Sequence, residues 1–589
     1  MLFALFAAPV SGFHQPVLTI ARGPELAEVE VNEVVVFRLR GPEAPSRAAE
    51  AADRLRRLNL TMPAAVTIQK IAGSPVLLVS RRPILTIDRR LAQSSGSEPM
   101  ALAVVWAQRL RQALGTPRVM VAPKSLALIP GERMLVRVHA FPQPDYVIGK
   151  YDRRIIDVRR VPEGILITAK ALGAAMIPLR AVSRTGREAA GRADIPVAVR
   201  HPAADLPSAI EVEVTGDPSD PALVQEAIRQ AVLRETQAHP GSEISVGTVE
   251  GAELVPGDTR DLPVPVRVRN PFRRSIEGIV RATVRNVSIP LQTPARLLVS
   301  NRPEAVTANG VLFAETLSTN EAVRLLYHHQ NGAEKAKLVT ITLTNPASEP
   351  ARMLIVGAVA GPSTDLMFAG QAATSRFLRR LQRQQGYVID VPPGRSHTFT
   401  VHEMPPGSLV SGLLQVQTLA GRLELAVHIR SPWLLAQTIT SDVNQPAYPH
   451  PHGTFQISEF SVTHSVLTRE RVSLVDLGIA VGPVDPSTGV RLVGDYGILY
   501  RLDLEVRNPS EFSERVSLMA TAAGGAARGI FLIDNEPVDV GFLRPNEERE
   551  IFSLIVPGRE SRRLTLVTMP VAGSFYPLRL TLRPDQPTQ

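Results

Sequence analysis

The chain has 589 residues, of which 44% are hydrophobic, 21% charged and only 5% aromatic, with 50 prolines and 40 glycines. This length is too great for one core and predicts three to six domains at the usual ~100–200 residues each, while the hydrophobic content excludes a disordered chain. The net charge is +9 and there is no cysteine, which excludes disulfides, thiolate metal sites and cysteine nucleophiles.

The positive charge comes almost entirely from arginine, because only six of the 65 basic residues are lysine. The arginines occur as scattered pairs such as Arg81-Arg82 and Arg159-Arg160, interleaved with acidic residues and without an aromatic-studded basic stripe. We therefore expect no nucleic-acid partner. A general attraction to acidic polymers or anionic surfaces is compatible with this charge.

Residues 1–12 (MLFALFAAPVSG) form a short apolar run followed by small residues, as in the hydrophobic and cleavage regions of a signal peptide. A positive N-terminal region is missing, and an ordinary buried strand is the alternative. We interpret residues 1–24 as a signal-like leader and linker. No later stretch approaches the ~18 apolar residues of a membrane helix. We thus expect a mature chain without a membrane span, located outside the cytoplasm (in the periplasm, on the cell surface or secreted).

Residues 25–117 mix strand and helix periodicities. Ala48, Ala51, Ala52 and Leu55 form the apolar stripe of a helix over residues 46–58, and a second helix is expected over 99–114 with Ser97 as its N-cap. Strands are expected at 29–39, 65–71 and 76–87. The order β-α-β-β-α predicts a small α+β domain.

Two phrases of this segment, VLLVSRRPILTI (76–87) and WAQRLRQAL (106–114), carry a resemblance to a known domain. The segment resembles the small extracytoplasmic domain that precedes some cyanobacterial small-conductance mechanosensitive channels. The resemblance covers about ninety residues. It implies an extracytoplasmic setting and no chemistry.

Residues 118–203 contain the phrases SLALIPG (125–131), GILITAKA (164–171) and GAAMIPL (173–179). With these phrases the segment resembles bacterial Ig-like domains of group 2, which implies a β-sandwich. The last two phrases also resemble the N-terminal domain of secretin-type pilus proteins. Pro178 interrupts the expected late strand and leaves its pairing in doubt.

Residues 204–295 are expected to form a second α+β domain. A strand at 210–214 is followed by a helix over 220–237, whose apolar face includes Leu223, Ala227, Ile228 and Ala231. Further strands are expected at 243–249, 264–269 and 278–287.

A strand ending in Asn-Pro recurs along the chain, as LVTITLTNP (338–346), LDLEVRNP (502–509) and VPVRVRNP (264–271). After the first two, a second strand and then a turn-and-strand phrase follow, at 391–401 and 543–556. This arrangement resembles Ig-like domains of the CARDB type at about 300–432 and 455–589. We therefore expect sandwiches at 296–432, with a helical insertion at 370–385, and at 455–589. Residues 433–454 between them lack periodicity and are interpreted as a linker.

No catalytic phrase is present: G-x-S-x-G, the phosphate-binding G-x-x-x-x-G-K-S/T and H-E-x-x-H are all missing. Six of the histidines occur in three groups. His450 and His452 have the H-x-H spacing of a zinc or copper site but no third ligand. His328 and His329 are expected on opposite faces of a strand, as are His397 and His402, so packing is the favoured interpretation.

Acidic residues could bind Ca²⁺ between sandwiches, at Asp217, Asp220 and Glu226 or at Asp485 and Asp495. None has the dense spacing of a loop that wraps the ion, and helix capping explains Asp217 and Asp220 better. The two tryptophans, Trp106 and Trp433, are too few for a sugar-stacking platform. The sequence assigns no catalytic, cofactor-binding or metal residue.

Together these features predict a mainly β, multidomain protein of tandem Ig-like sandwiches with two small α+β modules in its N-terminal half. The favoured function is a structural or adhesive protein of the bacterial cell envelope that is not an enzyme. Its partners would be other envelope proteins or wall polymers. The alternatives are a set of binding modules for wall polysaccharide or another acidic polymer, and an enzyme with an unfamiliar site.

Overall fold

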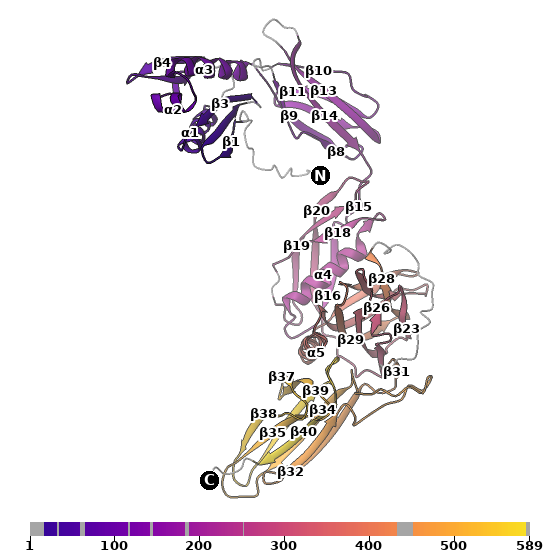
Figure 1. Cartoon of the computed structure of the whole chain (residues 1–589). Helices are drawn as coiled ribbons and strands as arrows, with labels where there is room; N and C mark the ends of the chain where they lie inside the picture. Colours follow the sequence, from indigo (N-terminus) through magenta and orange to yellow (C-terminus); the bar gives the residue numbers. More distant parts are fainter. Residues whose placement is uncertain are drawn as a thin grey trace. The chain divides into compact units, whose positions relative to one another are not determined.

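The computed structural model describes residues 17–31, 34–58, 65–115, 118–141, 145–182, 188–250, 253–432 and 452–584. The chain divides into two compact units, one of residues 1–203 with 270–274 and the other of residues 204–269 with 275–589 (Figure 1). The leader-like residues 1–12 and residues 433–451 of the expected linker lie outside the described residues.

The first module of the first unit is mixed α and β, as expected. Its apolar helix stripe of Ala48, Ala51, Ala52 and Leu55 is buried, and Trp106 packs against Phe37 with ring centroids 5.5 Å apart. The elements are β1 (Val17–Gly23), β2 (Leu26–Val31), β3 (Val34–Arg40), α1 (Ala44–Arg56), β4 (Val66–Ile71), β5 (Ser74–Val79), β6 (Arg82–Thr86), α2 (Arg89–Ser94) and α3 (Pro99–Gly115). They form two three-stranded sheets, β1-β2-β3 and β4-β5-β6.

Three details of this module differ from the sequence prediction. The expected strand 76–87 is a hairpin of β5 and β6, because Ser80 and Arg81 both adopt positive φ and turn the chain. Helix α3 begins at Pro99, directly after Glu98, so Ser97 is not its N-cap. Strand β1 lies within the segment interpreted as leader and linker and pairs along β2.

The second module is a sandwich of two four-stranded sheets, β10-β13-β14-β8 and β11-β12-β9-β7. Its strands are β7 (Arg118–Ala122), β8 (Leu126–Leu128), β9 (Arg133–Phe141), β10 (Tyr146–Ile148), β11 (Ile156–Val161), β12 (Gly164–Ala169), β13 (Gly173–Val182) and β14 (Glu188–Val199). Pro178 does not interrupt β13: it lies opposite Asp194 of β14, and its carbonyl oxygen accepts a hydrogen bond from Gly149 at 2.7 Å.

The second unit starts with the expected strand–helix–strands module. Asp220 caps its helix by accepting a hydrogen bond from the Ala222 amide at 2.6 Å, and Pro221 occupies the first turn, where its missing N–H costs nothing. The elements are β15 (Ala204–Asp205), β16 (Ala209–Val214), α4 (Pro221–Glu235), β17 (Gln237–Ala238), β18 (Glu243–Val246), β19 (Thr259–Arg269) and β20 (Ile276–Asn286).

The sheet of this module continues into the next one. Its order is β18-β19-β20-β16-β27-β26-β29-β24-β21-β31, with β22 off this path, and β16 joins β27 through Val214 and Tyr387. The boundary expected at 295/296 therefore falls inside one hydrogen-bonded sheet. The new elements are β21 (Arg296–Ser300), β22 (Ala305–Val306), β24 (Ala322–Asn331), β26 (Ala351–Ser363), β27 (Tyr387–Val391), β29 (Leu409–Ala420) and β31 (Gly453–Phe455).

The fourth and fifth modules are sandwiches with the same strand order. In the fourth, the β27-β26-β29-β24-β21 part of the long sheet faces a second sheet, β23-β30-β25-β28. In the fifth, β37-β36-β39-β34-β32 and β33-β40-β35-β38 repeat that order. The parallel pair β21·β24 corresponds to the parallel pair β32·β34. The strands are β23 (Gly310–Leu317), β25 (Lys337–Thr344), β28 (Ser396–Met404), β30 (Leu423–Arg430), β32 (Glu459–Leu467), β33 (Val472–Leu477), β34 (Leu499–Arg507), β35 (Glu514–Ala522), β36 (Ala527–Ile533), β37 (Glu536–Leu543), β38 (Glu548–Val556), β39 (Ser561–Thr568) and β40 (Leu578–Pro584).

A buried asparagine closes corresponding loops of the two sandwiches. Asn508, after β34, donates to the carbonyls of Phe512 and Val556 at 2.7 and 2.8 Å. Asn331, the last residue of β24, donates to those of Lys335 and Met404 at 2.9 and 2.8 Å. The structural equivalent of Asn508 is thus Asn331, which glycine follows.

The recurring Asn-Pro phrase instead predicts that Asn345 corresponds to Asn508. Asn345 makes the same contacts one strand later, to Glu349 and Val391 at 2.8 and 2.9 Å. The feature that recurs is therefore an asparagine whose side-chain amide donates to two backbone carbonyls. Proline follows this asparagine in some copies and not in others.

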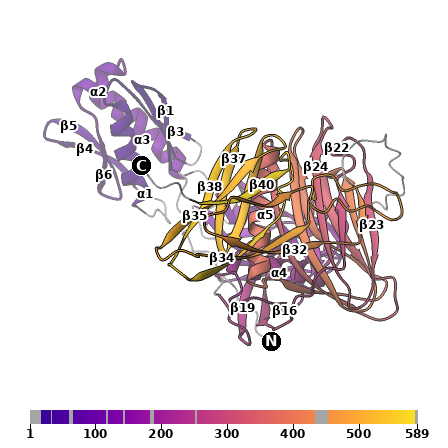
Figure 2. The ribbon, with the colours of Figure 1, turned by 90° about the horizontal axis from the view of Figure 1, so that it is seen from below.

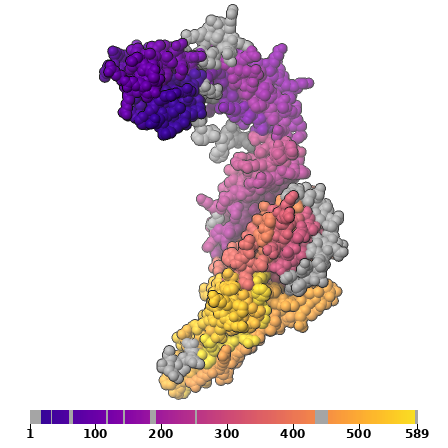
Figure 3. Space-filling view, viewed as in Figure 1, coloured from indigo at the N-terminus to yellow at the C-terminus, as the bar shows by residue number. Residues whose placement is uncertain are grey.

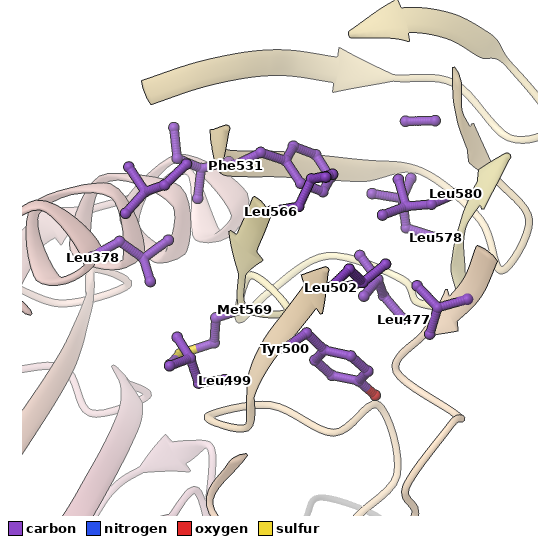
Figure 4. Packing of buried hydrophobic residues seen from close by; sticks show 14 of the residues in the cluster. Leu378, Leu477, Leu499, Tyr500, Leu502, Phe531, Leu566, Met569, Leu578 and Leu580 are labelled. Atoms are coloured by element: carbon purple, nitrogen blue, oxygen red, sulfur yellow. The ribbon is translucent and has the colours of Figure 1, made fainter. Parts of the chain in front are cut away.

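The two sandwiches share one hydrophobic core across helix α5 (Leu366–Gln382), the expected helical insertion. Figures 1 and 2 show α5 beside the strands of the last module, and Figure 4 shows Leu378 of α5 together with Phe531 and Leu566. Gly370 fits against the last module because a Cβ there would lie 1.9 Å from the Ala572 carbonyl oxygen. The two modules are consequently in direct contact in the space-filling view (Figure 3).

Arg324 of β24 is fully buried in this joint. Its guanidinium donates to the Ser458 carbonyl at 2.6 Å, the Gln415 side chain at 3.2 Å and the Glu459 carboxylate at 3.1 Å. Burial lowers the pKa of Arg324, and the Glu459 carboxylate opposes that shift. A buried cation with several acceptors from both modules favours one arrangement of the joint.

Candidate functional site

A groove runs along the second unit where its three modules meet. It consists of two hollows of about 460 and 370 Å³, and Gln382, Gln384 and Asn535 line both of them. The first hollow is completed by the loop after β16, including Asp217, and the second by residues 290–293 and Arg501 of β34. The walls thus come from segments more than 300 residues apart in sequence.

Local structure explains how the groove is held in shape. The Thr215 hydroxyl donates to the Gln384 carbonyl at 2.6 Å and accepts from the Gly386 amide at 2.9 Å. The Gln382 side chain donates to the Asn535 carbonyl at 2.8 Å. These bonds connect the loop after β16, the end of α5 and the β36–β37 turn, so all three modules contribute to one preformed concavity.

The floor of the second hollow is aliphatic, with Leu291, Leu378, Leu381, Leu532 and Val567 among its residues. The rim is polar. Six of its charged or amide side chains make no hydrogen bond or ion pair with the described residues: Asp217, Gln292, Arg383, Gln384, Arg501 and Asn535. None of the described lining residues is aromatic.

Gln384 occupies a position that glycine usually fills. The Gln384 amide donates to Leu381 at 3.1 Å and the Gln385 amide to Arg380 at 2.8 Å, which is the Schellman pattern at a helix C-terminus. This pattern holds Gln384 at φ 51°, a left-handed conformation that is unfavourable for a long side chain. Gln384, unlike a glycine at this position, has a side chain, and the residue lines both halves of the groove.

His397 and His402 lie on the same face of β28, contrary to the prediction. Phe399 is an extra residue opposite β25, so His397 pairs with Leu343 and His402 with Val339, two residues on one face of β25. The His397 ring contacts the Gln230 side-chain oxygen of α4 at 3.1 Å. Burial lowers the pKa of both histidines to about 4, with nearby Arg229 acting in the same direction.

His328 and His329 point to opposite faces of β24, as predicted. His329 is fully buried between the Ser300 hydroxyl at 3.0 Å and the Pro303 carbonyl at 2.8 Å, and burial lowers its pKa to about 4. His328 instead lines a separate hollow of about 210 Å³ beside Tyr496 and Phe575. The two imidazoles therefore serve no common site.

Of the two histidines with H-x-H spacing, only His452 belongs to the described residues, because His450 lies outside them. Trp433 also lies outside the described residues. His452 packs edge-on against Phe313 with ring centroids 5.5 Å apart, and burial lowers its pKa. No group of three or more histidine and carboxylate side chains able to hold a metal occurs in the described part of the chain.

Most of the candidate acidic residues bind backbone amides or side chains of the chain itself. Asp220 caps α4, and Glu226 binds Arg229 at 2.8 Å. Asp485 accepts from the amides of Thr454 and Ser487, and Asp495 from those of Val481 and Gly482. Among these candidates, the carboxylate of Asp217 makes no hydrogen bond or ion pair with the described residues, and Asp217 lies in the groove rather than at the N-cap of α4.

Sequence reasoning therefore missed the groove. Its polar residues are exposed side chains on five separate segments, and no local pattern connects these segments. The described helices also include none long and apolar enough to cross a lipid bilayer.

Comparison with known families gives one match. Residues 28–116 match a family described as "Domain of unknown function (DUF8459)". The match lies within the first α+β module and assigns no activity to it. No curated protein matches the chain.

Solved structures show distant likenesses. Human mucin-like protocadherin EC1-2 is 12% identical, over 29% of this chain and 98% of that one, with a TM-score of 0.12. The fibronectin(III)-like modules of Clostridium thermocellum CbhA are 15% identical over 30% and 98%, with a TM-score of 0.16. The Bacteroides ovatus mixed-linkage glucan protein SGBP-B is 8% identical over 53% and 95%, with a TM-score of 0.13. Scores this low transfer no function to the chain.

Proposed function

We propose that the chain is an exported structural and adhesive protein of the bacterial cell envelope, in which tandem sandwiches act as spacers and contact surfaces. The observation that carries this proposal is the joint between the fourth and fifth modules. A spacer requires joints that resist bending, and here the two sandwiches share a core across α5 and are bonded through the buried Arg324.

The role needs no catalysis. Apart from Asp217, the candidate acidic residues bind backbone amides or neighbouring side chains, and the candidate histidines His329 and His397 are buried in contacts with neighbouring residues. The export part of the proposal is supported by the leader-like residues 1–12 and by the resemblance of residues 25–117 to an extracytoplasmic domain.

The location is tested by expressing the full chain with its own start and a C-terminal tag in the source bacterium. We expect it in the envelope or medium, and accessible to added protease in cells with a permeabilised outer layer. Recovery of the chain in the cytoplasm alone would refute the proposal.

The spacer role is tested by the distance between two spin labels. Because the chain has no cysteine, Glu424→Cys and Ser561→Cys give two unique attachment points, on exposed positions of the fourth and fifth modules. We expect one narrow distance distribution by pulsed electron resonance, which broadens when Arg324→Ala is added. A broad distribution in the otherwise unchanged chain would contradict a rigid joint.

A second candidate function is binding of wall polysaccharide or another acidic polymer, and the polar groove favours it. This function predicts retention on isolated wall material that decreases as salt is raised. Retention that protease treatment of the wall abolishes would instead indicate a protein partner.

A further inference from the structure

The polar groove has the chemistry of a ligand site rather than of a structural crevice. Polar side chains that are covered inside a joint are normally paired, whereas exposed ones bind water and can exchange it for a ligand. Here the side chains that pair the modules, such as Gln382 and Thr215, are distinct from the rim side chains that remain free. The bonds that connect the modules do not use these exposed rim groups, so the rim groups are available to a ligand.

The side chain of Gln384 adds a second, independent observation. Glycine at this helix end would relieve a strained backbone and preserve both Schellman hydrogen bonds. A residue that breaks a local folding rule at a concave surface is expected where function requires its side chain. The amide of Gln384 points to a ligand with both donors and acceptors, because an amide group offers both.

The charges of the groove indicate the class of ligand. Arg383 lines only the first hollow and Arg501 only the second, so each half offers one unpaired guanidinium. On the acidic side, Glu459 is already bound by Arg324, which leaves Asp217 as the one free carboxylate among the described lining residues. A guanidinium binds carboxylates through strong, charge-assisted hydrogen bonds.

The absence of aromatic lining among the described residues argues against a neutral sugar. Neutral glycans are commonly held by stacking on aromatic rings, which these walls do not offer. Affinity must then come from charge and hydrogen bonds. Side-chain amides match sugar hydroxyls, and the two arginines match acid groups placed along the polymer.

We propose that this groove binds an acidic polysaccharide chain, with the amides of Gln292, Gln384 and Asn535 on its hydroxyls and with Arg383 and Arg501 on its carboxylates. This inference rests on the adhesive part of the proposed function. It names the site and the ligand class for that role.

The test is calorimetric titration of the full chain with a uronic-acid oligosaccharide, tetragalacturonate. Arg383→Ala and Arg501→Ala are each expected to weaken binding about tenfold, the usual effect of losing one charge-assisted hydrogen bond. The double variant is expected to weaken it about a hundredfold. Both arginines are exposed, and the matched control Arg562→Ala removes another exposed arginine outside the groove with no expected effect.

Two further probes separate the contributions. Maltotetraose has the hydroxyls without the acid groups, and tetraglutamate has the acid groups on a peptide; both are expected to bind at least tenfold more weakly. Equal binding of tetraglutamate would overturn the polysaccharide assignment in favour of a peptide. No binding of tetragalacturonate, or binding that Arg383→Ala and Arg501→Ala leave unchanged, would overturn the site. A cytoplasmic chain that still binds tetragalacturonate would refute the envelope role alone.

Discussion

Acidification from pH 7.5 to 5 is expected to destabilise the second unit far more than its carboxylates can explain. His329, His397 and His402 are buried and neutral, each with a pKa of about 4 in place of 6.5. The unfolded chain binds protons below pH 6.5 and the folded chain does not until about pH 4. The contribution of these neutral histidines to the free energy of unfolding is therefore fully present above pH 6.5 and is lost as the pH falls toward 4.

The size of the effect follows from these values. One such histidine costs ~2 kcal/mol at pH 5 relative to pH 7.5, and three cost ~6 kcal/mol. If the second unit, roughly 380 residues, unfolds as one block, its unfolding entropy of roughly 0.8 kcal/mol per kelvin converts this loss to a decrease in Tm of ~7 °C. His428 and His452 have pKa values lowered in the same direction and add to it.

Scanning calorimetry of the full chain at pH 7.5, 6 and 5 measures the decrease. The matched variant carries His329→Gln, His397→Gln and His402→Gln and is expected to lose most of the pH dependence, whatever its stability at pH 7.5. Carboxylates with lowered pKa values, such as Asp485, titrate below this window. An unchanged Tm between pH 7.5 and 5, or an undiminished slope in the triple variant, would refute the reasoning.

Three further predictions test the fold and the groove. Arg324→Ala leaves the Glu459 carboxylate without its buried partner and should cost about 3–5 kcal/mol in urea unfolding, more than Glu459→Gln, which retains a hydrogen-bonding side chain. Asn508→Ala leaves two carbonyls without a donor and should cost about 2–4 kcal/mol, whereas Asn508→Asp should cost less only at a pH low enough to protonate it. Gln384→Gly should raise stability by about 0.5–1 kcal/mol and yet weaken tetragalacturonate binding several-fold, while a loss of both would mean that the side chain is structural.

The alternating strands, the helices α1, α3, α4 and α5, and the sandwich class were all accessible to sequence reasoning, because each is a short-range pattern. The bulge at Phe399 was not, since one extra residue shifts every later side chain of β28 to the other face without a local signal. His397 and His402 were therefore placed on opposite faces. The sequence repeat likewise aligned Asn345 with Asn508, because both are followed by proline. Asn331, the structural equivalent of Asn508, is followed by glycine, and its hydrogen bonds to two carbonyls leave no pattern in the sequence.

The groove lies beyond sequence reasoning for a different reason. The two sandwiches have the same strand order, but β36 and β37 are joined by the tight Asp534-Asn535 turn, while α5 is inserted between β26 and β27. That insertion creates both the rigid joint and the wall that carries Arg383 and Gln384. A helix required only for rigidity could end in glycine. Helix α5 is instead followed by Gln384, a residue with a strained backbone whose side chain lines the polar groove. One element of the fold therefore serves both the rigid joint and the contact surface.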